Sequence, residues 1–270
     1  MVLKHLTREE LESIFDNTAQ EVIKFYLNRA LLAQPERVDN QKELPIQIPK
    51  EHLEQYIVQA IGAIGVGAGN YGVDVITNDF GADVKMVSTS YNKKGQLKKD
   101  TGETSLAQNF VDTGVNLDIL FKNKEWNTII SGWSNILYNK LKKVFTDNPN
   151  INNIYYFFII RDRNVFHLCG LEVNLDEIFN ITPLYDKNNN VIVTDTSLFI
   201  DNFINSNLGN VKIYKSKKRM ELRLHPKYWF DNKLTIYFDL DYNSNCLNAR
   251  EVIENNKADI YMKKRINELF

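Results

Sequence analysis

Residues 64–90 read IGVGAGNYGVDVITNDFGADVKMVSTS and carry the clearest structural pattern of the chain. After a glycine-rich start, the runs at 73–76 and 82–88 are rich in valine and have the composition of short β-strands. An asparagine, an aspartate and a glycine within 78–81 supply the residues that a tight connection requires. The stretch therefore predicts a β-hairpin.

Two acidic side chains of this hairpin are expected to meet. Asp74 lies on the first strand, and pairing of the strands can bring it beside Asp83 on the second. Because strand side chains alternate between faces, Lys85 shares a face with Asp83, whereas Val84 points away. A solvated surface hairpin is the alternative, but the valines of both strands indicate a mostly buried one, where unused carboxylates would be costly.

This grouping suits a divalent cation. Two carboxylates a few ångströms apart repel each other unless a cation neutralises them. A set of oxygen ligands suits Mg²⁺, which also binds phosphate. Lys85 would then lie beside an attacking water and a phosphate, where it could orient or deprotonate the water and stabilise the charge of the transition state. The residues therefore predict metal-dependent phosphodiester hydrolysis.

The spacing resembles that of a known nuclease family. Asp74, eight intervening positions and then Asp83-Val84-Lys85 resemble the PD-(D/E)xK nucleases, to which most type II restriction endonucleases belong. The resemblance covers roughly residues 50–90, and Val73 stands where the family name has proline. It implies that the two aspartates and the backbone carbonyl of Val84 bind Mg²⁺ and that Lys85 is the catalytic lysine.

The resemblance also implies a glutamate from the preceding helix and a particular activity. Glu54 is the best-placed glutamate, and Glu21 is a second candidate. The implied enzyme is a homodimeric type II restriction endonuclease that hydrolyses double-stranded DNA at a specific sequence and leaves a 5′-phosphate. A DNA-repair or mobile-element nuclease of the same fold remains open, as does a non-catalytic DNA-binding protein that keeps the hairpin for packing.

The rest of the chain predicts helices on both sides of the hairpin and mixed β-structure after it. Helices are expected at 7–32, 50–63, 126–145 and 248–268, with a short one at 197–206, and the polar residues 92–105 are expected to form a loop. Strands are expected at 153–161, 165–174, 211–215, 220–224 and 234–240. This order predicts a single α/β or α+β domain over 1–270 with a restriction-endonuclease-like mixed central β-sheet flanked by helices. Its parts are an N-terminal helical part at about 1–64, the catalytic hairpin at 72–90 and a C-terminal β-rich DNA-binding part at about 185–245.

A basic segment follows the predicted core. Residues 212–227 carry seven positive charges against Glu221, in a chain of net charge −1. Lysine and arginine neutralise DNA phosphates, which dominates DNA affinity. The alternative is an edge strand that its lysines protect from aggregation. The candidates for DNA contact are Lys215, Lys217, Lys218, Arg219 and Arg223.

Other features have simpler interpretations. Gly67, Gly69 and Gly72 match G-x-G-x-x-G, but a helix precedes them and a strand follows, which excludes the dinucleotide-binding arrangement. They either let the backbone approach DNA or permit a tight helix-to-strand connection. Lys140, Lys142 and Lys143 end the helix at 126–145, where positive charge suits the helix dipole.

Composition bounds the remaining possibilities. A hydrophobic content of 43% in 270 residues is enough for a full core. Two cysteines do not imply a disulfide framework or a zinc site. No apolar run is long enough to span a membrane, and no apolar signal core is apparent at the start, so a cytoplasmic protein is expected.

Overall fold

The predicted hairpin forms one side of a central mixed sheet. A computed structural model of the protein describes residues 1–42, 45–66, 71–110, 114–242 and 246–269. In it, β2 (Ile64–Gly65), β3 (Val75–Ile76) and β4 (Phe80–Ser88) are antiparallel neighbours. The prediction of a hairpin is confirmed, although its first strand begins at Val75 rather than at residue 73.

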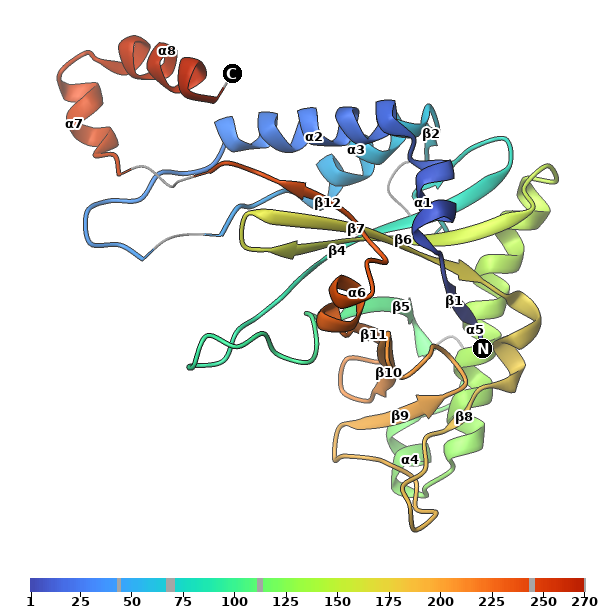
Figure 1. The fold of residues 1–270 in the computed structure, drawn as a ribbon. Helices are drawn as coiled ribbons and strands as arrows, with labels where there is room; N and C mark the ends of the chain where they lie inside the picture. The colour runs from blue at the N-terminus through green and yellow to red at the C-terminus, as the bar shows by residue number, and fades with distance from the viewer. Residues whose placement is uncertain (43–44, 67–70, 111–113, 243–245, 270) are drawn as a thin grey trace.

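The longest strands continue the sheet from β4. β6 (Asn153–Asp162) pairs with β4 in parallel, and β7 (Val165–Val173) pairs with β6 in antiparallel orientation. β6 is buried from Ile154 to Ile160, as expected for a central strand covered on both faces. β1 (Leu3–His5) and β12 (Ile236–Asp239) pair with opposite ends of β7. The predicted class, a mixed central sheet flanked by helices, is confirmed (Figure 1).

Three helices cover one face of this sheet: α1 (Arg8–Ile14), α2 (Asn17–Leu32) and α3 (Lys50–Ile61). Their apolar faces pack on the side chains that point from the sheet toward these helices, such as Val84 and Phe157. The predicted single helix at 7–32 is wrong, because the chain breaks at 15–16 and Asp16 caps a new helix by accepting a hydrogen bond from the Ala19 amide. Figure 1 shows α2 and α3 above the sheet.

A second, antiparallel sheet lies on the other side of the molecule. Its order is β5-β11-β10-β9-β8, with bounds Thr104–Gln108, Arg219–Leu224, Gly209–Tyr214, Ser197–Asp201 and Thr182–Pro183. One prediction is wrong here. The short helix expected at 197–206 is β9, because Leu198 and Ile200 are both buried at the two-residue period of a strand. The loop expected at 92–105 is confirmed over residues 92–103, and β5, which pairs with β11, begins at Thr104.

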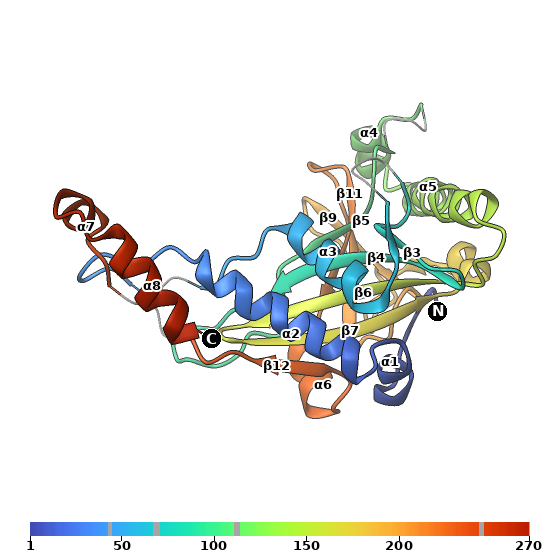
Figure 2. The ribbon, with the colours of Figure 1, turned by 90° about the horizontal axis from the view of Figure 1, so that it is seen from above.

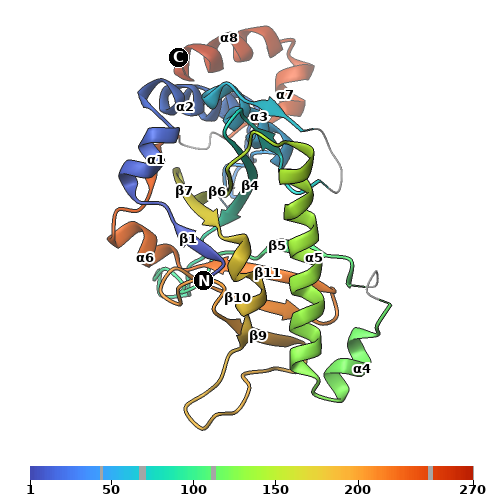
Figure 3. The same ribbon diagram turned by 90° about the vertical axis from the view of Figure 1, so that its right-hand side faces the viewer.

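A long helix joins the two sheets. α5 (Trp126–Asp147) runs alongside both of them, and α4 (Leu117–Lys122) lies near its start (Figure 3). One core cluster contains Trp133 of α5, Phe158 of the central sheet and Ile213 of the second sheet. The face of β4 that carries Asp83 and Lys85 is turned toward this junction, because its other face packs on the helices α2 and α3.

The remaining helices are peripheral. They are η2 (Leu175–Asn180), α6 (Pro226–Asp231), α7 (Ala249–Glu254) and α8 (Ala258–Leu269). The single helix expected at 248–268 is interrupted after α7, where Asn256 has a positive φ of 54°. α7 and α8 lie at one end of the molecule, near α2 (Figure 2). None of the helices in the described ranges combines the length and apolarity that crossing a bilayer needs.

One glycine of the glycine-rich segment has a packing role. Gly67 and Gly69 lie outside the described residues. At Gly72, a Cβ atom would come within 2.6 Å of Val144 Cγ2 and 2.9 Å of the Lys140 carbonyl oxygen. Gly72 therefore lets α5 pack directly against the chain that leads into β3, which favours the structural explanation for this glycine.

Candidate active site

The hairpin directs Asp74 toward the β4 edge. The Asp74 amide donates a 2.9 Å hydrogen bond to the carbonyl of Ala82, the residue that also pairs with Val75. Asp74 and Val75 therefore both lie against Ala82, as in a β-bulge, and a bulge can redirect a side chain. The Asp74 carboxylate reaches the Val84 amide, which donates to Oδ2 at 2.9 Å.

Asp83 and Lys85 complete the group from β4. Lys85 Nζ contacts Asp83 Oδ1 and lies 3.8 Å from Asp74 Oδ2. The carboxyl groups of Asp74 and Asp83 are close enough to shift each other's pKa. The prediction that the three side chains converge on one side of the sheet is thus confirmed. Asp83 is the most buried of them, with 3% of its side chain exposed.

The two carboxyl groups differ in their affinity for a proton. Burial raises the pKa of Asp83 to about 7, and the neighbouring Asp74 carboxylate adds to this effect while Lys85 opposes it. Burial also disfavours ionisation of Asp74, but the hydrogen bond with Asp83, the Lys85 ammonium and the Val84 amide outweigh it and lower the pKa of Asp74. A proton shared by the pair therefore resides on Asp83.

This arrangement fits a small divalent cation. A cation could replace the shared proton between the two carboxylates, which are oxygen ligands of the kind Mg²⁺ prefers. The Val84 carbonyl points to the same edge as the Val84 amide, toward Asp74, because the N–H and C=O of one strand residue share an edge. The Tyr156 hydroxyl, on the strand position paired with Asp83, is buried and has no hydrogen-bond partner among the described residues.

The protein ligands would leave room for water. Within the described residues, no cluster of three or more histidine, cysteine or acidic side chains is placed to hold a metal. Mg²⁺ usually keeps several waters and takes only one or two protein carboxylates. The two aspartates with the Val84 carbonyl therefore suit Mg²⁺ better than a cation that requires a full protein cage.

The three side chains open into a cavity of about 700 Å³. Its walls come from the hairpin, β4, β5, α5 and the start of α3. Polar side chains are frequent on these walls. They include Lys50, Tyr71, Asp74, Asp83, Lys85, Glu103, Thr104, Ser105, Gln108, Asn109 and Lys140.

The predicted glutamates lie outside this group. Glu54 is on α3, where its carboxylate is 3.1 Å from Lys50 Nζ, and it does not line the cavity. Lys50 does line it, and its ammonium is electrostatically coupled to Asp74 and Asp83. Glu21 is exposed on α2. The structure therefore brings Asp74, Asp83 and Lys85 together but puts Lys50, rather than Glu54, beside them.

Among the cavity side chains that sequence reasoning missed is Lys140. Its Nζ lies 4.0 Å from Asp83 Oδ2 and 3.4 Å from the Leu106 carbonyl oxygen. A signal was present in the sequence, because Lys140 follows Trp133 and Leu137 at intervals of seven and three residues, in the buried stripe of the helix. The interpretation of Lys140, Lys142 and Lys143 as charges that suit the helix dipole overlooked this spacing.

The basic segment lies on the second sheet, next to the cavity. Glu103, which lines the cavity, accepts hydrogen bonds from Lys217 and from Arg223, the latter at 2.6 Å. These two bonds hold the pKa of Glu103 down at about 2. Lys215 Nζ lies 5.6 Å from the centre of the Phe121 ring, and Lys218 and Arg219 are exposed at the β10–β11 turn. Two of the five predicted DNA contacts thus already have a carboxylate partner.

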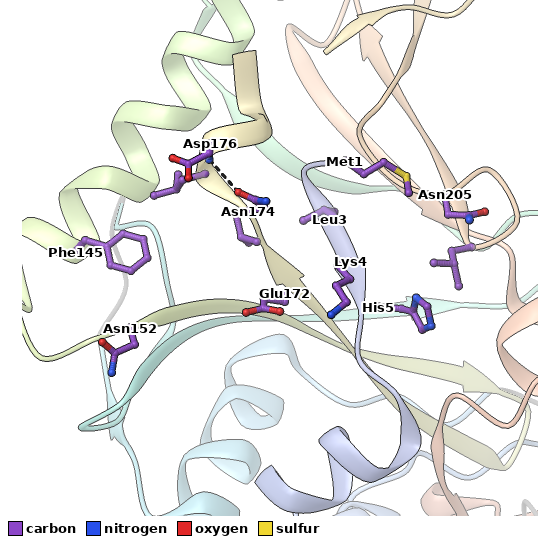
Figure 4. Close-up of a pocket in the computed structure, with 13 residues that line it drawn as sticks. Met1, Leu3, Lys4, His5, Phe145, Asn152, Glu172, Asn174, Asp176 and Asn205 are labelled. Atoms are coloured by element: carbon purple, nitrogen blue, oxygen red, sulfur yellow. Dashed lines mark hydrogen bonds between the residues drawn. The ribbon is translucent and has the colours of Figure 1, made fainter. Parts of the chain in front are cut away.

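Another cavity, of about 600 Å³, lies beside β1, β7 and η2. Figure 4 shows Glu172 and Asp176 in it, coming from separate elements and lying apart, with Lys4 between Glu172 and His5. The hydrogen bond drawn there, from the Asp176 amide to Asn174 Oδ1 at 3.1 Å, is the cap of η2. It offers no converging pair of carboxylates, so the cavity at Asp83 is the candidate active site.

No protein-family model, curated protein or solved structure matches this chain, so its function has to be inferred from the geometry of the cavity at Asp83.

Proposed function

We propose that this protein is a Mg²⁺-dependent endodeoxyribonuclease that hydrolyses phosphodiester bonds of double-stranded DNA, as a type II restriction endonuclease. The observation that supports it is the convergence of Asp74, Asp83 and Lys85 at one end of a polar cavity. Two carboxyl groups that share one ammonium neighbour suit metal-assisted phosphodiester hydrolysis, in which carboxylates hold the cation and a lysine orients the water.

Each residue has a distinct role in the proposal. The carboxylates of Asp74 and Asp83 and the carbonyl of Val84 hold the cation. When bound, Mg²⁺ supplies Lewis acidity at the phosphate and makes water easier to deprotonate. Lys85 orients the attacking water, and its positive charge stabilises the negative charge that develops on the phosphate. The Val84 amide fixes Asp74 by the 2.9 Å hydrogen bond to its carboxylate.

The proposal includes three further properties. The basic residues Lys215, Lys217, Lys218, Arg219 and Arg223 contact the DNA backbone near the cavity. The enzyme acts as a homodimer, because a two-fold protein matches a palindromic site. It works in the cytoplasm, where its DNA substrate is found.

A plasmid-cleavage assay tests the activity. Wild type should cut supercoiled plasmid with Mg²⁺ and not with EDTA, and Lys85→Ala should slow cleavage by about 100-fold or more. Lys142→Ala, which removes an exposed lysine of α5, should cut like wild type. Cleavage that survives both EDTA and Lys85→Ala would contradict the proposal.

The products separate the related alternatives. Cutting at one fixed sequence supports a restriction enzyme, and cutting directed by DNA structure supports a repair or mobile-element nuclease. DNA binding without cleavage under any metal supports a non-catalytic DNA-binding protein. In that case Asp83→Ala should change stability and leave DNA binding unchanged.

A further inference from the structure

Lys140 lies where a helix normally buries apolar side chains. The same face of α5 carries Trp133, Leu137, Leu141 and Val144, all of them buried. Lysine is rarely found on such a face, because burying an ammonium group costs free energy, and only 27% of the Lys140 side chain is exposed. The neighbouring Lys142 is exposed on the other side of the helix. Lys140 therefore calls for an explanation that an ordinary surface lysine does not.

The position of the Lys140 backbone is fixed by close packing. A Cβ atom at Gly72 would come within 2.9 Å of the Lys140 carbonyl oxygen, so the backbones approach closely only because residue 72 is glycine. Gly81 packs in the same way against the Val144 side chain, at 3.4 Å from a built Cβ. Helix α5 is thus held against both strands of the hairpin that carries Asp74 and Asp83.

The described residues give the ammonium group of Lys140 few and long contacts. It lies 4.0 Å from Asp83 Oδ2, which is beyond hydrogen-bond distance. Among the described residues, its one hydrogen bond is a long one of 3.4 Å to the Leu106 carbonyl. An ammonium group has three donors, so donors remain for a further acceptor in the cavity that Lys140 lines.

Lys85 and Lys140 lie on different sides of Asp83. Lys85 contacts Oδ1 of this carboxylate from β4, and Lys140 faces Oδ2 from α5. An anion bound in the cavity next to Asp83 would therefore have one ammonium group from the sheet and another from the helix. For a phosphodiester, the two cations would share the negative charge that develops on its oxygens.

We propose that Lys140 is a second cationic residue of the active site, which contacts the phosphate of the DNA from the α5 wall while Lys85 contacts it from β4. This inference rests on the proposed nuclease function. The competing explanation is that Lys140 only balances the charge of Asp83 and never touches the substrate. If Lys140 contacts the phosphate, removing its charge lowers kcat, and a positive charge at residue 140 restores it. If Lys140 acts only through Asp83, a change of Mg²⁺ concentration or pH restores it.

The test compares three variants of the full-length protein. Lys140→Met keeps the long side chain and removes the charge, Lys140→Arg keeps the charge, and Lys142→Met is the matched control on the same helix. At saturating plasmid and Mg²⁺, Lys140→Met should lower kcat by about 100-fold with an unchanged melting temperature. Lys140→Arg should recover at least about ten-fold of that loss, and Lys142→Met should match wild type.

Two results would overturn the inference. One is a kcat of Lys140→Met equal to that of wild type while Lys85→Ala is inactive. This result would reject the role of Lys140 and would still support the nuclease function. The other is a loss in Lys140→Met that is seen only at subsaturating Mg²⁺ or disappears at higher pH, because Lys140 would then act only through Asp83. If wild type cleaves no DNA with any divalent cation, the proposed function fails and this inference fails with it.

Discussion

The carboxylate of Asp74 accepts a 2.9 Å hydrogen bond from the backbone amide of Val84, the residue between Asp83 and Lys85. This bond ties the chain before β3 to the triplet on β4 and places both carboxylates beside Lys85 Nζ. A divalent cation could take the place of the proton that they share. Binding of that cation can be measured without any DNA.

Mg²⁺ should therefore stabilise the protein through Asp74. A cation that binds only the folded state at about 100 times its dissociation constant adds about 2.7 kcal/mol of stability, which raises the melting temperature. Asp74→Asn removes one of the two charges and should abolish this rise. Asp79→Asn changes an exposed aspartate in the turn of the same hairpin and should keep it. An equal rise in both variants would place the cation elsewhere.

Metal-free stability should depend on pH through Asp83. Burial raises the pKa of Asp83 to about 7, whereas an aspartate in the unfolded chain titrates near 3.9. Between these values the folded state holds a proton that the unfolded state has lost. The contribution of Asp83 is therefore fully present below about pH 4 and is lost as pH rises through about 7.

Urea unfolding in EDTA at pH 5 to 8 measures this effect. Asp83→Asn lacks the titrating group, so it should gain stability relative to wild type as pH rises toward 7, by at most about 1.4 kcal/mol per pH unit. Because the pKa of Asp74 is lowered, this residue stays ionised between pH 5 and 8 and does not obscure the effect of Asp83. Asp239→Asn, at an exposed strand position, should stay parallel to wild type. Parallel curves for Asp83→Asn would contradict the assignment of the proton.

Much of the fold could be predicted from local patterns. The capping box at Thr7 and Glu10 marks the first helix, and the apolar run at 153–161 marks the central strand. The region at 197–206 was mistaken for a helix because a five-residue strand carries only two or three alternations, too few to distinguish the periods. Its identity depends on pairing with β10, which no local pattern contains.

Only part of the candidate site could be predicted from local patterns. Asp74, Asp83 and Lys85 lie within twelve residues, so strand alternation and hairpin pairing were enough to group them. Lys140 is 55 positions after Lys85 and reaches the cavity only through the packing of α5 on Gly72. Glu103 directly precedes β5 of the other sheet. Contacts between distant elements depend on tertiary packing, which a single sequence does not specify residue by residue.

Gly72→Ala should destabilise the protein and disturb the site together. The new Cβ would lie 2.6 Å from Val144 Cγ2 and 2.9 Å from the Lys140 carbonyl oxygen, and the backbone contact cannot be relieved by rotating a side chain. Overpacking of this kind costs about 1–3 kcal/mol. Gly102→Ala, where the nearest atoms would be 3.9 Å away, should stay within about 0.5 kcal/mol of wild type. Equal unfolding free energies for the two variants would show that α5 adjusts freely.

Glu103→Gln should bind DNA more tightly than wild type. Glu103 occupies Lys217 and Arg223 with its carboxylate, and it lies on the wall of the cavity where the proposed substrate binds. Replacing it with a neutral amide would free positive charge for DNA phosphates, so affinity should rise several-fold and fall more steeply with salt. Stability should change little, because Lys217 and Arg223 are partly exposed. The buried Lys212, which lies 3.7 Å from Glu103, keeps Glu221 at 3.7 Å as a partner.

Fluorescence anisotropy with a labelled duplex in EDTA measures binding without cleavage. Glu254→Gln, which breaks an exposed pair with Arg250 on α7, is the matched control and should bind like wild type. If Glu103→Gln binds more weakly while the control does not, Glu103 orients the two cations for DNA rather than competing with it. Tighter binding would identify Glu103 as an internal competitor, and weaker binding would identify it as a positioning residue. Both roles require Glu103 to lie near the bound DNA, because removing a distant carboxylate would leave the affinity nearly unchanged.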